Sequence, residues 1–598
     1  MHSSLFAPAR PAPAHRRKRN VLAAAALAAS GLASQPAFVL AQPSGNAAAT
    51  PAAGVSQRYD IPDGPLGPVL NRFAQRAGIA LSYPPDLAEG KRSPGVSGEY
   101  TVPAAFEALL QGTGLRAVSD GSGSYSLRSA PQQVMNTGAS AGSTVLAAGS
   151  LAEVRVTANA ENDAWGPVSG YIARRSASAT KSDTPLVETP QSVTVVSRQQ
   201  MDDRGVQTMT EAIQYSAGIT GDNAADNRYD KPVIRGFAAR QFLDGTYLVY
   251  GTGVYNMPRI EPYGLEKVEI LRGPSSVLYG ANAPGGLVNM ISKRPSEQQL
   301  REVGLLVGNY GRQQAQFDLG GKVDDNGIVT WRLTGIARSG GTQTDYADDD
   351  RVFIAPAVTI RPSARTQLTL MASYQKDKLG TLINFLPREG TLTPTQWGTI
   401  SSRFFTGEPD FNRFDREGSS AGWSLSHAFT DSLTFRQNAR YLRSDMVYQG
   451  VYAVGWQPGT SYLRRASLDA YGDLDSFVID NQLEWKHRAG DWQHTVLAGF
   501  DYQKANSYEA QGYGTVGSGL GLINPFAPVY GQRINPITSY TGTEQHQKQS
   551  GVYAQYQGSF AERRFLTGSL RRDEADSQTL TTRFTNLGRV TSSATTDM

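Results

Sequence analysis

The chain has 598 residues, of which 39% are hydrophobic and 18% are charged, and it contains no Cys. Its length allows about four ordinary domains, although a large β-barrel uses several domain lengths as one unit. The lack of Cys excludes thiol catalysis, Cys-ligated zinc and a disulfide framework. The six His form no HExxH pattern, and neither GxxxxGKS nor GxxxxGKT occurs, so a metal hydrolase or a P-loop NTPase fits poorly. We therefore expect that the chain is not an enzyme and that it holds no cofactor and no metal directly.

The first 41 residues predict a secretory signal peptide. They hold five Lys or Arg and no acid, so removing them changes the formal net charge from +4 to −1. An apolar stretch from Val21 to Ala33 follows these charges, and Val39-Leu40-Ala41 resembles a cleavage site. A basic tail that binds nucleic acid is the alternative, but the adjacent apolar stretch disfavours it. No later run reaches the ~18 apolar residues of a membrane helix, so the exported protein can cross a membrane only as a barrel.

Residues 57–128 predict a small domain in which strands and helices alternate. Apolar residues from Leu66 to Ala77 share one helical face, and Gly78 follows as a stop signal. A second helical face runs from Val102 to Leu110, and a hairpin follows it. The domain has no acid/base or metal-ligating cluster, which indicates a recognition module.

Residues 129–150 consist largely of Gly, Ala, Ser and Gln and predict a flexible linker. In the segment 151–158, which follows, Val154 and Val156 alternate with polar neighbours as in a lone strand. Such a strand suits addition to a partner's sheet. Docking on the neighbouring domain is the alternative, and the spacing alone leaves both open.

Residues 180–295 predict a second α/β domain of short strands and tight turns. A capping box at Thr208 to Glu211 opens a helix, and Gly273-Pro274 marks a turn. Arg235, Glu269 and Arg272 are charges within otherwise apolar strands. They form ordinary surface ion pairs or, if the domain is enclosed, they face partners on a surrounding wall.

After Arg301 the chain alternates apolar and polar residues with a period of two, as at Val303, Leu305 and Val307. A soluble sandwich and a membrane barrel share this alternation. The predicted connections, however, are long and short in turn, which is typical of an outer-membrane barrel. The long ones are 339–351, 378–418, 444–475 and 507–547, and the short ones are 362–364, 430–432, 488–491 and 559–563.

Four stretches resemble the TonB-dependent ferric-siderophore receptors that carry an N-terminal signalling domain. Leu265 to Pro295 resembles the end of the plug domain in that family, and Val233 to Phe237 and Leu243 to Gly245 resemble two other plug strands. Gln57 to Arg128 resembles the secretin/TonB short N-terminal domain. The resemblance implies about half of a 22-stranded antiparallel membrane β-barrel, an α/β plug domain and a small N-terminal βαβ-type signalling domain.

The resemblance also assigns boundaries and residues. The expected parts are a signal peptide (1–41), a signalling domain (57–128), a linker (129–150), a TonB box (151–158), a plug (180–295) and an incomplete barrel (301–598). The box itself comprises Glu153, Val154, Arg155, Val156, Thr157 and Ala158. The plug motif comprises Arg235, Gly236, Asp244, Gly245, Glu269, Arg272, Gly273, Pro274, Tyr279 and Gly280.

Ligand contacts are expected on two loops of the plug. Arg offers charge and fork geometry to an anionic chelate, and aromatic residues offer apolar contact area. For each residue a solvated loop position is the alternative. The candidates are Asn227, Arg228, Tyr229, Tyr250, Tyr255 and Met257.

The resemblance implies an outer-membrane receptor that imports ferric siderophores with energy from the TonB protein. Its N-terminal domain would lie in the periplasm and signal to an inner-membrane anti-sigma regulator, while outer-membrane lipid surrounds the barrel. The alternatives are a non-transporting remnant, or an importer of another ligand such as cobalamin or a carbohydrate. About eleven strands precede a polar segment that ends at Met598, so we expect a truncated receptor.

Overall fold

The computed structural model describes residues 57–82, 85–88, 90–119, 124–129, 163–221, 226–252, 255–257, 259–381, 383–517, 521–585 and 594–597. The chain divides into two compact units, residues 1–152 and residues 153–598. The predicted signal peptide, nearly all of the predicted linker and the predicted TonB box lie outside the described residues, so these remain predictions. Within the described residues, no helix has the length and apolar character needed to cross a membrane.

The first unit packs its helices against small sheets. Strand β1 pairs antiparallel with β5, while β7 lies between β3 and β6 and runs parallel to β3. Its elements are β1 (Gln57–Ile61), β2 (Gly64–Pro65), α1 (Leu66–Ala77), β3 (Ala80–Ser82), α2 (Pro85–Ala88), β4 (Arg92–Ser93), β5 (Val96–Tyr100), α3 (Val102–Leu110), β6 (Leu115–Ser119) and β7 (Ser124–Ser129).

The core of the first unit is apolar and closed. Helix α1 buries five apolar residues on one face and ends at Gly78, whose φ of 64° suits glycine. Four aromatic rings then form a chain through the core, with neighbouring centroids 4.9–5.0 Å apart. They belong to Tyr59, Phe73, Phe106 and Tyr125. The predicted helices 66–77 and 102–110 are confirmed.

The second unit contains an inner α/β part, which we call the plug (residues 191–295), and a preceding segment, which we call the strap (residues 163–190). The plug sheet has the order β10-β16-β17-β14-β15, with β14 parallel to β17, and β11-β12-β13 form a second sheet. The strap holds β8 (Arg175–Ser176), β9 (Thr184–Pro185) and the 3-10 helix η2 (Leu186–Glu188). The plug holds β10 (Ser192–Ser197), α4 (Arg198–Asp203), α5 (Met209–Ile213), β11 (Ile219–Gly221), β12 (Pro232–Ile234), β13 (Phe237–Ala238), β14 (Arg240–Leu243), β15 (Thr246–Tyr247), η3 (Pro262–Gly264), β16 (Leu265–Arg272), α6 (Ser276–Tyr279) and β17 (Gly286–Ser292).

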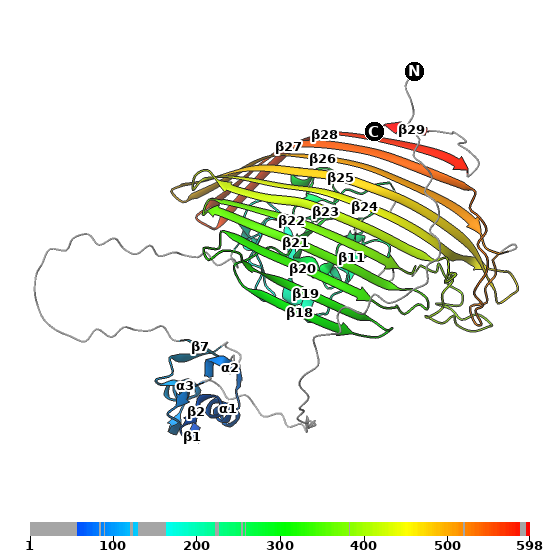
Figure 1. The fold of residues 1–598 in the computed structure, drawn as a ribbon. Coiled ribbons are helices and arrows are strands. Elements are labelled where there is room, and N and C mark those ends of the chain that lie inside the picture. The colour runs from blue at the N-terminus through cyan, green and yellow to red at the C-terminus, as the bar shows by residue number, and fades with distance from the viewer. Residues whose placement is uncertain are drawn as a thin grey trace, which may run out of the picture. The chain divides into compact units, whose positions relative to one another are not determined.

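The remaining strands form one antiparallel sheet in chain order, which we call the wall, and it curves around the plug (Figure 1). Its described strands number twelve, one more than the roughly eleven predicted, because the short β29 follows β28. They are β18 (Leu300–Val307), β19 (Gln313–Lys322), β20 (Val329–Ser339), β21 (Asp349–Ser363), β22 (Thr366–Leu379), β23 (Arg413–Ala428), β24 (Leu433–Trp456), β25 (Leu463–Ala489), β26 (Trp492–Thr515), β27 (Ser539–Phe560), β28 (Arg564–Thr585) and β29 (Ala594–Asp597).

One predicted long loop is wrong. Residues 444–475 are almost entirely strand, since β24 continues to Trp456 and β25 begins at Leu463. The outer part of these strands carries polar side chains on both faces, as at Arg443, Ser444 and Asp445, so the two-residue alternation fades. The backbone ladder nevertheless continues to the end of both strands. Strand length in this region therefore exceeds what the apolar pattern reveals.

The wall exposes apolar side chains and buries polar ones, the reverse of a water-soluble sheet. On β25, Leu483 and Trp485 are 42% and 41% exposed, whereas Asp480 and Glu484, which face the opposite side, are 3% and 2% exposed. The outward-facing side chains from Phe477 to Trp485 are apolar except for Asn481, and this stretch has the length of a membrane-crossing strand, about 9–11 residues. A surface of this kind is stable in contact with lipid. It therefore supports a membrane-embedded sheet and not a soluble sandwich.

Candidate functional site

Three of the six predicted ligand candidates, Arg228, Tyr229 and Tyr255, meet at the end of the plug. The guanidinium of Arg228, whose Nη1 donates to the hydroxyls of Tyr255 and Tyr448 at 3.4 Å each, lies 5.1 and 5.5 Å from the centres of the two rings. Tyr229 also approaches it, at 5.7 Å. We call Arg228, Tyr229, Tyr255 and Tyr448 the apex cluster. It presents a positive charge surrounded by aromatic faces, an arrangement that stabilises the charge.

The charge of Arg228 is already balanced within the plug. Its Nε and Nη2 donate to the two carboxylate oxygens of Asp226 at 2.9 and 2.8 Å. Burial opposes the charged form of Arg228, but Asp226 together with Tyr448 and Tyr255 outweighs burial, and the pKa of Arg228 is raised above its usual value. Arg228 and Tyr448 are buried, whereas Tyr229 and Tyr255 are half-buried, so the apex cluster offers the aromatic surface of these two residues rather than a free cation.

The other three candidates have mainly structural contacts. The amide of Asn227 donates to the carbonyl of Gly380 at 2.7 Å, and the carbonyl of Met257 accepts from Arg416 at 2.8 Å, so both residues tie the plug to the wall. The hydroxyl of Tyr250 accepts from the backbone amide of Gln241 within the plug. The role of all six candidates in ligand binding remains a prediction.

Sequence reasoning missed Tyr448, because it searched only the plug loops. Tyr448 lies on β24 of the wall, is 1% exposed and follows Met446, which is also buried, at the two-residue spacing of the inward face. The same spacing continues to Tyr452 on the same strand. An inward-facing tyrosine near the outer end of a long strand was the signal that could have identified it.

The turn residues of the predicted plug motif occupy positions that require unusual backbone angles. Asp244 and Gly245 connect β14 to β15 with φ of 52° and 79°, and Arg235 and Gly236 connect β12 to β13 with φ of 51° and 86°. Gly273 and Gly280 flank Pro274 and helix α6 with φ of 93° and 72°. Glycine adopts such angles at little cost, whereas strained non-glycine residues often mark functional positions.

Glu269 and Arg272 are buried and do not reach the wall, so both alternatives, a surface ion pair and a partner on the wall, are wrong for these two residues. Glu269 accepts from Ser176 and Ser178 of the strap at 2.7 and 2.5 Å, and Arg272 donates to Ala217 and Thr194 inside the plug at 2.7 Å each. The reason is their position on β16, which lies between β10 and β17 in the plug sheet. Arg235 lies in an exposed hairpin.

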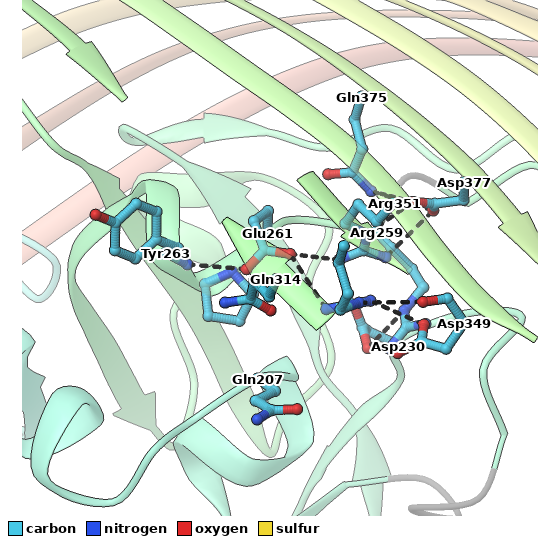
Figure 2. A network of polar contacts seen from close by, with 12 residues as sticks. Gln207, Asp230, Arg259, Glu261, Tyr263, Gln314, Asp349, Arg351, Gln375 and Asp377 are labelled. Carbon is cyan, nitrogen blue, oxygen red and sulfur yellow. Dashed lines mark hydrogen bonds and ion pairs between the residues drawn. The ribbon is translucent and has the colours of Figure 1, made fainter. Parts of the chain in front are cut away.

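Other charged residues make the contacts between plug and wall. Figure 2 shows Glu261 of the plug beside Arg351 of β21, whose Nη1 donates to it at 2.8 Å. Arg351 also donates to Asp377 of β22 at 2.7 Å, and Arg416 of β23 pairs with the same carboxylate at 3.0 Å. All four side chains are at most 3% exposed. Because each charge has partners, the network tolerates burial that an isolated charge would not.

Two further ion pairs join the plug to neighbouring strands. Asp244 accepts from Arg440 of β24 at 2.5 Å, and Lys293 donates to Asp318 of β19 at 2.8 Å. Burial lowers the pKa of Lys293, while Asp318 opposes that effect. An apolar patch of Leu442, Leu474 and Val478 also packs on the plug core. The boundary between plug and wall is thus a mixture of buried charges and apolar contacts.

The chain matches three family models. Residues 79–130 match "Secretin and TonB N terminus short domain", residues 185–287 match "TonB-dependent Receptor Plug Domain", and residues 356–597 match "TonB dependent receptor-like, beta-barrel". These matches agree in order with the three parts of the structure.

Two curated relatives share about a third of their aligned residues with the chain. The ferrioxamine B receptor of Salmonella typhimurium is 35% identical over 395 residues, which are 65% of this chain and 56% of the relative. The ferrichrome outer membrane transporter/phage receptor of Escherichia coli is 34% identical over 447 residues, which are 70% of this chain and 59% of the relative. The chain therefore spans a little over half the length of these relatives.

Solved structures share the fold. The closed form of the ferric-catecholate import receptor Fiu from Escherichia coli superposes with a TM-score of 0.61 at 20% identity, covering 72% of this chain and 64% of that one. The FpvA–pyoverdine–iron complex from Pseudomonas aeruginosa gives a TM-score of 0.55 at 18% identity, covering 88% of this chain and 68% of that one. At these identities the likeness concerns the fold alone.

Proposed function

Because this chain belongs to the TonB-dependent receptor family, we propose that it takes part in the TonB-driven import of ferric siderophores across the outer membrane. The observation that carries the proposal is the buried plug, held by paired charges against a wall that is apolar outside and polar inside. In this arrangement the plug would block a passage along the inner face of the wall. The plug could still move, because water and new partners can replace its polar contacts with the wall. The family consists of receptors and transporters, so we propose transport and signalling rather than catalysis.

The apex cluster is the proposed contact for the chelate. Its Arg228 is neutralised by Asp226, so its aromatic rings and hydroxyl groups suit a chelate without a large negative charge. The names of the curated relatives, receptors for ferrioxamine and ferrichrome, support an iron chelate as the ligand. The earlier expectation that Arg228 itself attracts an anionic chelate has less support, because a bidentate carboxylate already occupies its fork.

Energy would enter through the predicted TonB box at residues 153–158, ten residues or fewer before the described strap begins. A strand of this kind can pair with the edge of a partner's sheet and transmit a pull. A domain has a stability of roughly 5–15 kcal/mol, and one charge crossing 100 mV supplies about 2.3 kcal/mol. Several transferred protons could therefore displace part of the plug, whereas thermal opening would be rare.

The first unit would serve signalling. It matches the secretin and TonB short domain, and its apolar core leaves the polar surface for partners. We propose an inner-membrane anti-sigma regulator as the partner, with this unit in the periplasm.

The test is a panel of ferric chelates given to receptor-deficient cells with and without this chain. We expect at least one ferric siderophore to restore growth under iron limitation, and only in cells with a functional TonB protein. Growth restored by none of the chelates, together with no measurable chelate binding, would contradict the proposal. Binding of cobalamin or of a carbohydrate in place of the chelates would replace the proposed ligand by that alternative.

A further inference from the structure

One buried carboxyl group on β26 takes part in none of the contacts described above. Glu509 is 3% exposed. Its Oε1 accepts from the side-chain amide of Gln511, whereas its Oε2 has no hydrogen-bond partner. The group lies outside the membrane-crossing stretch, because Gly472, the residue opposite it on β25, precedes Phe477. A buried carboxylate oxygen without a donor is costly, so its retention here indicates that something else satisfies it.

Asn256 of the plug presents a second unpaired oxygen at the same place. Its side chain is 0% exposed, and its Nδ2 donates to the carbonyl of Tyr508 at 3.0 Å, so its Oδ1 is the atom without a partner. The amide fills the space above Gly472, where an added Cβ would lie 2.6 Å from Nδ2 and 3.1 Å from Oδ1. Because Gly472 and Glu509 are directly opposite each other in the ladder, Asn256 lies next to Glu509. The two unpaired oxygens thus belong to neighbouring side chains.

A proton on Glu509 satisfies both oxygens. An amide oxygen and an ionised carboxylate can each only accept a hydrogen bond, whereas a protonated carboxyl group donates one. Turning the amide of Asn256 around would not help, because its oxygen would then face the carbonyl of Tyr508. Burial also favours the protonated form and raises the pKa of Glu509 to about 7, although the hydrogen bond from Gln511 opposes this effect.

The groups that face Glu509 bring no positive charge to it. Its opposite residues on β25 and β27 are Gly472 and Thr543, neither of which titrates. On β26, Tyr513 lies on the same face, and Tyr255 approaches from the plug. Burial raises the pKa of Tyr255, and the carboxylate of Glu509 adds to the effect, so this tyrosine stays neutral. Among the described residues, only burial and Gln511 shift the pKa of Glu509.

Asn256 directly follows Tyr255, which belongs to the apex cluster. We call the plug residues from Tyr250 to Met257 the apex loop. We propose that Glu509 carries a proton while the apex loop is attached to the wall, that it donates to Oδ1 of Asn256, and that this contact positions Tyr255. Glu509 is thus a positioning residue. Its bearing on chelate binding rests on the proposed function, whereas the protonated contact itself can be measured without ligand or TonB.

The contact should weaken as the pH rises. In the detached loop the hydrated carboxyl group of Glu509 would have its ordinary pKa of 4.5, against about 7 when the loop is attached. The detached state therefore loses its proton first, and the stability of the attachment falls between these two values. Linkage predicts that the detached fraction rises about tenfold from pH 6 to pH 8 and changes little above pH 8.

Amide hydrogen exchange of the full chain in detergent micelles measures the detachment. The reporter is the peptide that contains Thr252, whose backbone amide donates to Oγ of Ser507 at 2.9 Å and so joins the apex loop to β26. Protection is expressed relative to the intrinsic exchange rate at each pH. We expect it to fall about tenfold from pH 6 to pH 8. The protection of Val268, which lies in the plug sheet, should stay constant.

Glu509→Gln is the decisive variant, because its amide can donate to Asn256 at every pH. It should keep the protection of Thr252 high and remove its dependence on pH. Glu544→Gln is the matched control, since it removes a carboxylate of β27 that is 48% exposed. It should keep the tenfold fall of the unchanged chain.

Infrared spectroscopy tests the proton itself. The unchanged chain should lose one protonated-carboxyl band between pH 6 and pH 8. At pH 6 Glu509→Gln should lack this band, and Glu544→Gln should retain it. Protection of Thr252 that does not depend on pH would overturn the proposal, and so would an undiminished fall or an unchanged band in Glu509→Gln. No chelate is present, so a failure of the proposed import would leave these results unaffected.

Discussion

The first unit and the plug–wall boundary differ in what holds them together. In the first unit the tilted and edge-to-face rings of Tyr59, Phe73, Phe106 and Tyr125 form part of an apolar core. At the boundary, Glu261, Arg351, Asp377 and other buried charges share the contact with an apolar patch. An apolar core resists partial opening, because each contact that opens exposes apolar surface to water. Paired charges can instead be hydrated one pair at a time, which suits the opening that the proposed transport would require.

The largest effect should come from the apolar core. Phe106→Ala should destabilise the first unit by about 3–5 kcal/mol, which is comparable to the whole stability of a small domain. Amide exchange in the full chain should lose protection over residues 57–129 and keep it over the plug and wall. Phe237→Ala, at a residue 48% exposed in the plug, is the control and should have little effect. Retained protection in the Phe106→Ala variant would show that this core is not the main source of stability.

A smaller loss should follow when one boundary charge is removed. Arg351→Met leaves Asp377 with Arg416 as a remaining partner, so we expect about 2–3 kcal/mol rather than the full cost of an isolated buried charge. The melting temperature of the second unit measures it. Replacing both Arg351 and Asp377 with apolar residues should lose more than Arg351→Met, because the buried Arg416 then loses its carboxylate partner as well. A loss in the double variant no larger than that of Arg351→Met would contradict the network, because it would show that Arg416 gains no stability from Asp377.

At the apex cluster, Tyr255→Ala should weaken chelate binding by about 1–2 kcal/mol, or roughly five- to thirtyfold, through the loss of aromatic contact. Equilibrium binding of the chelate found in the panel measures this. Tyr250→Phe, which removes only a hydroxyl bonded inside the plug, is the control and should keep near-normal affinity. Equal losses in both variants would assign the effect to plug stability rather than to ligand contact.

The smallest effect should come from a partly exposed pair. Arg175→Ala removes an ion pair whose side chains are 27% and 28% exposed, and such pairs contribute about 0–1 kcal/mol. The melting temperature should shift by no more than about 3 °C. A shift as large as that of Arg351→Met would mean that burial is not what separates the two kinds of contact.

The apolar features could be predicted from the sequence, and the charged ones could not. The helix from Leu66 to Ala77 and its end at Gly78 follow from local periodicity. The outward apolar face of the wall follows from a period of two. The ion-pair partners Lys181 and Asp480 lie 299 residues apart, and no local pattern indicates how the plug is rotated within the wall. For the same reason Tyr448 was missed, although Arg228 and Tyr255 were among the predicted candidates.

The proline substitution Val156→Pro within the predicted TonB box tests the central claim most directly, because it removes a backbone donor from the strand that would pair with TonB. Uptake and surface binding of a radiolabelled ferric chelate are compared in energised cells that carry the unchanged chain or the variant. TonB-driven import predicts that binding is retained and uptake is abolished. Undiminished uptake in the variant would contradict it.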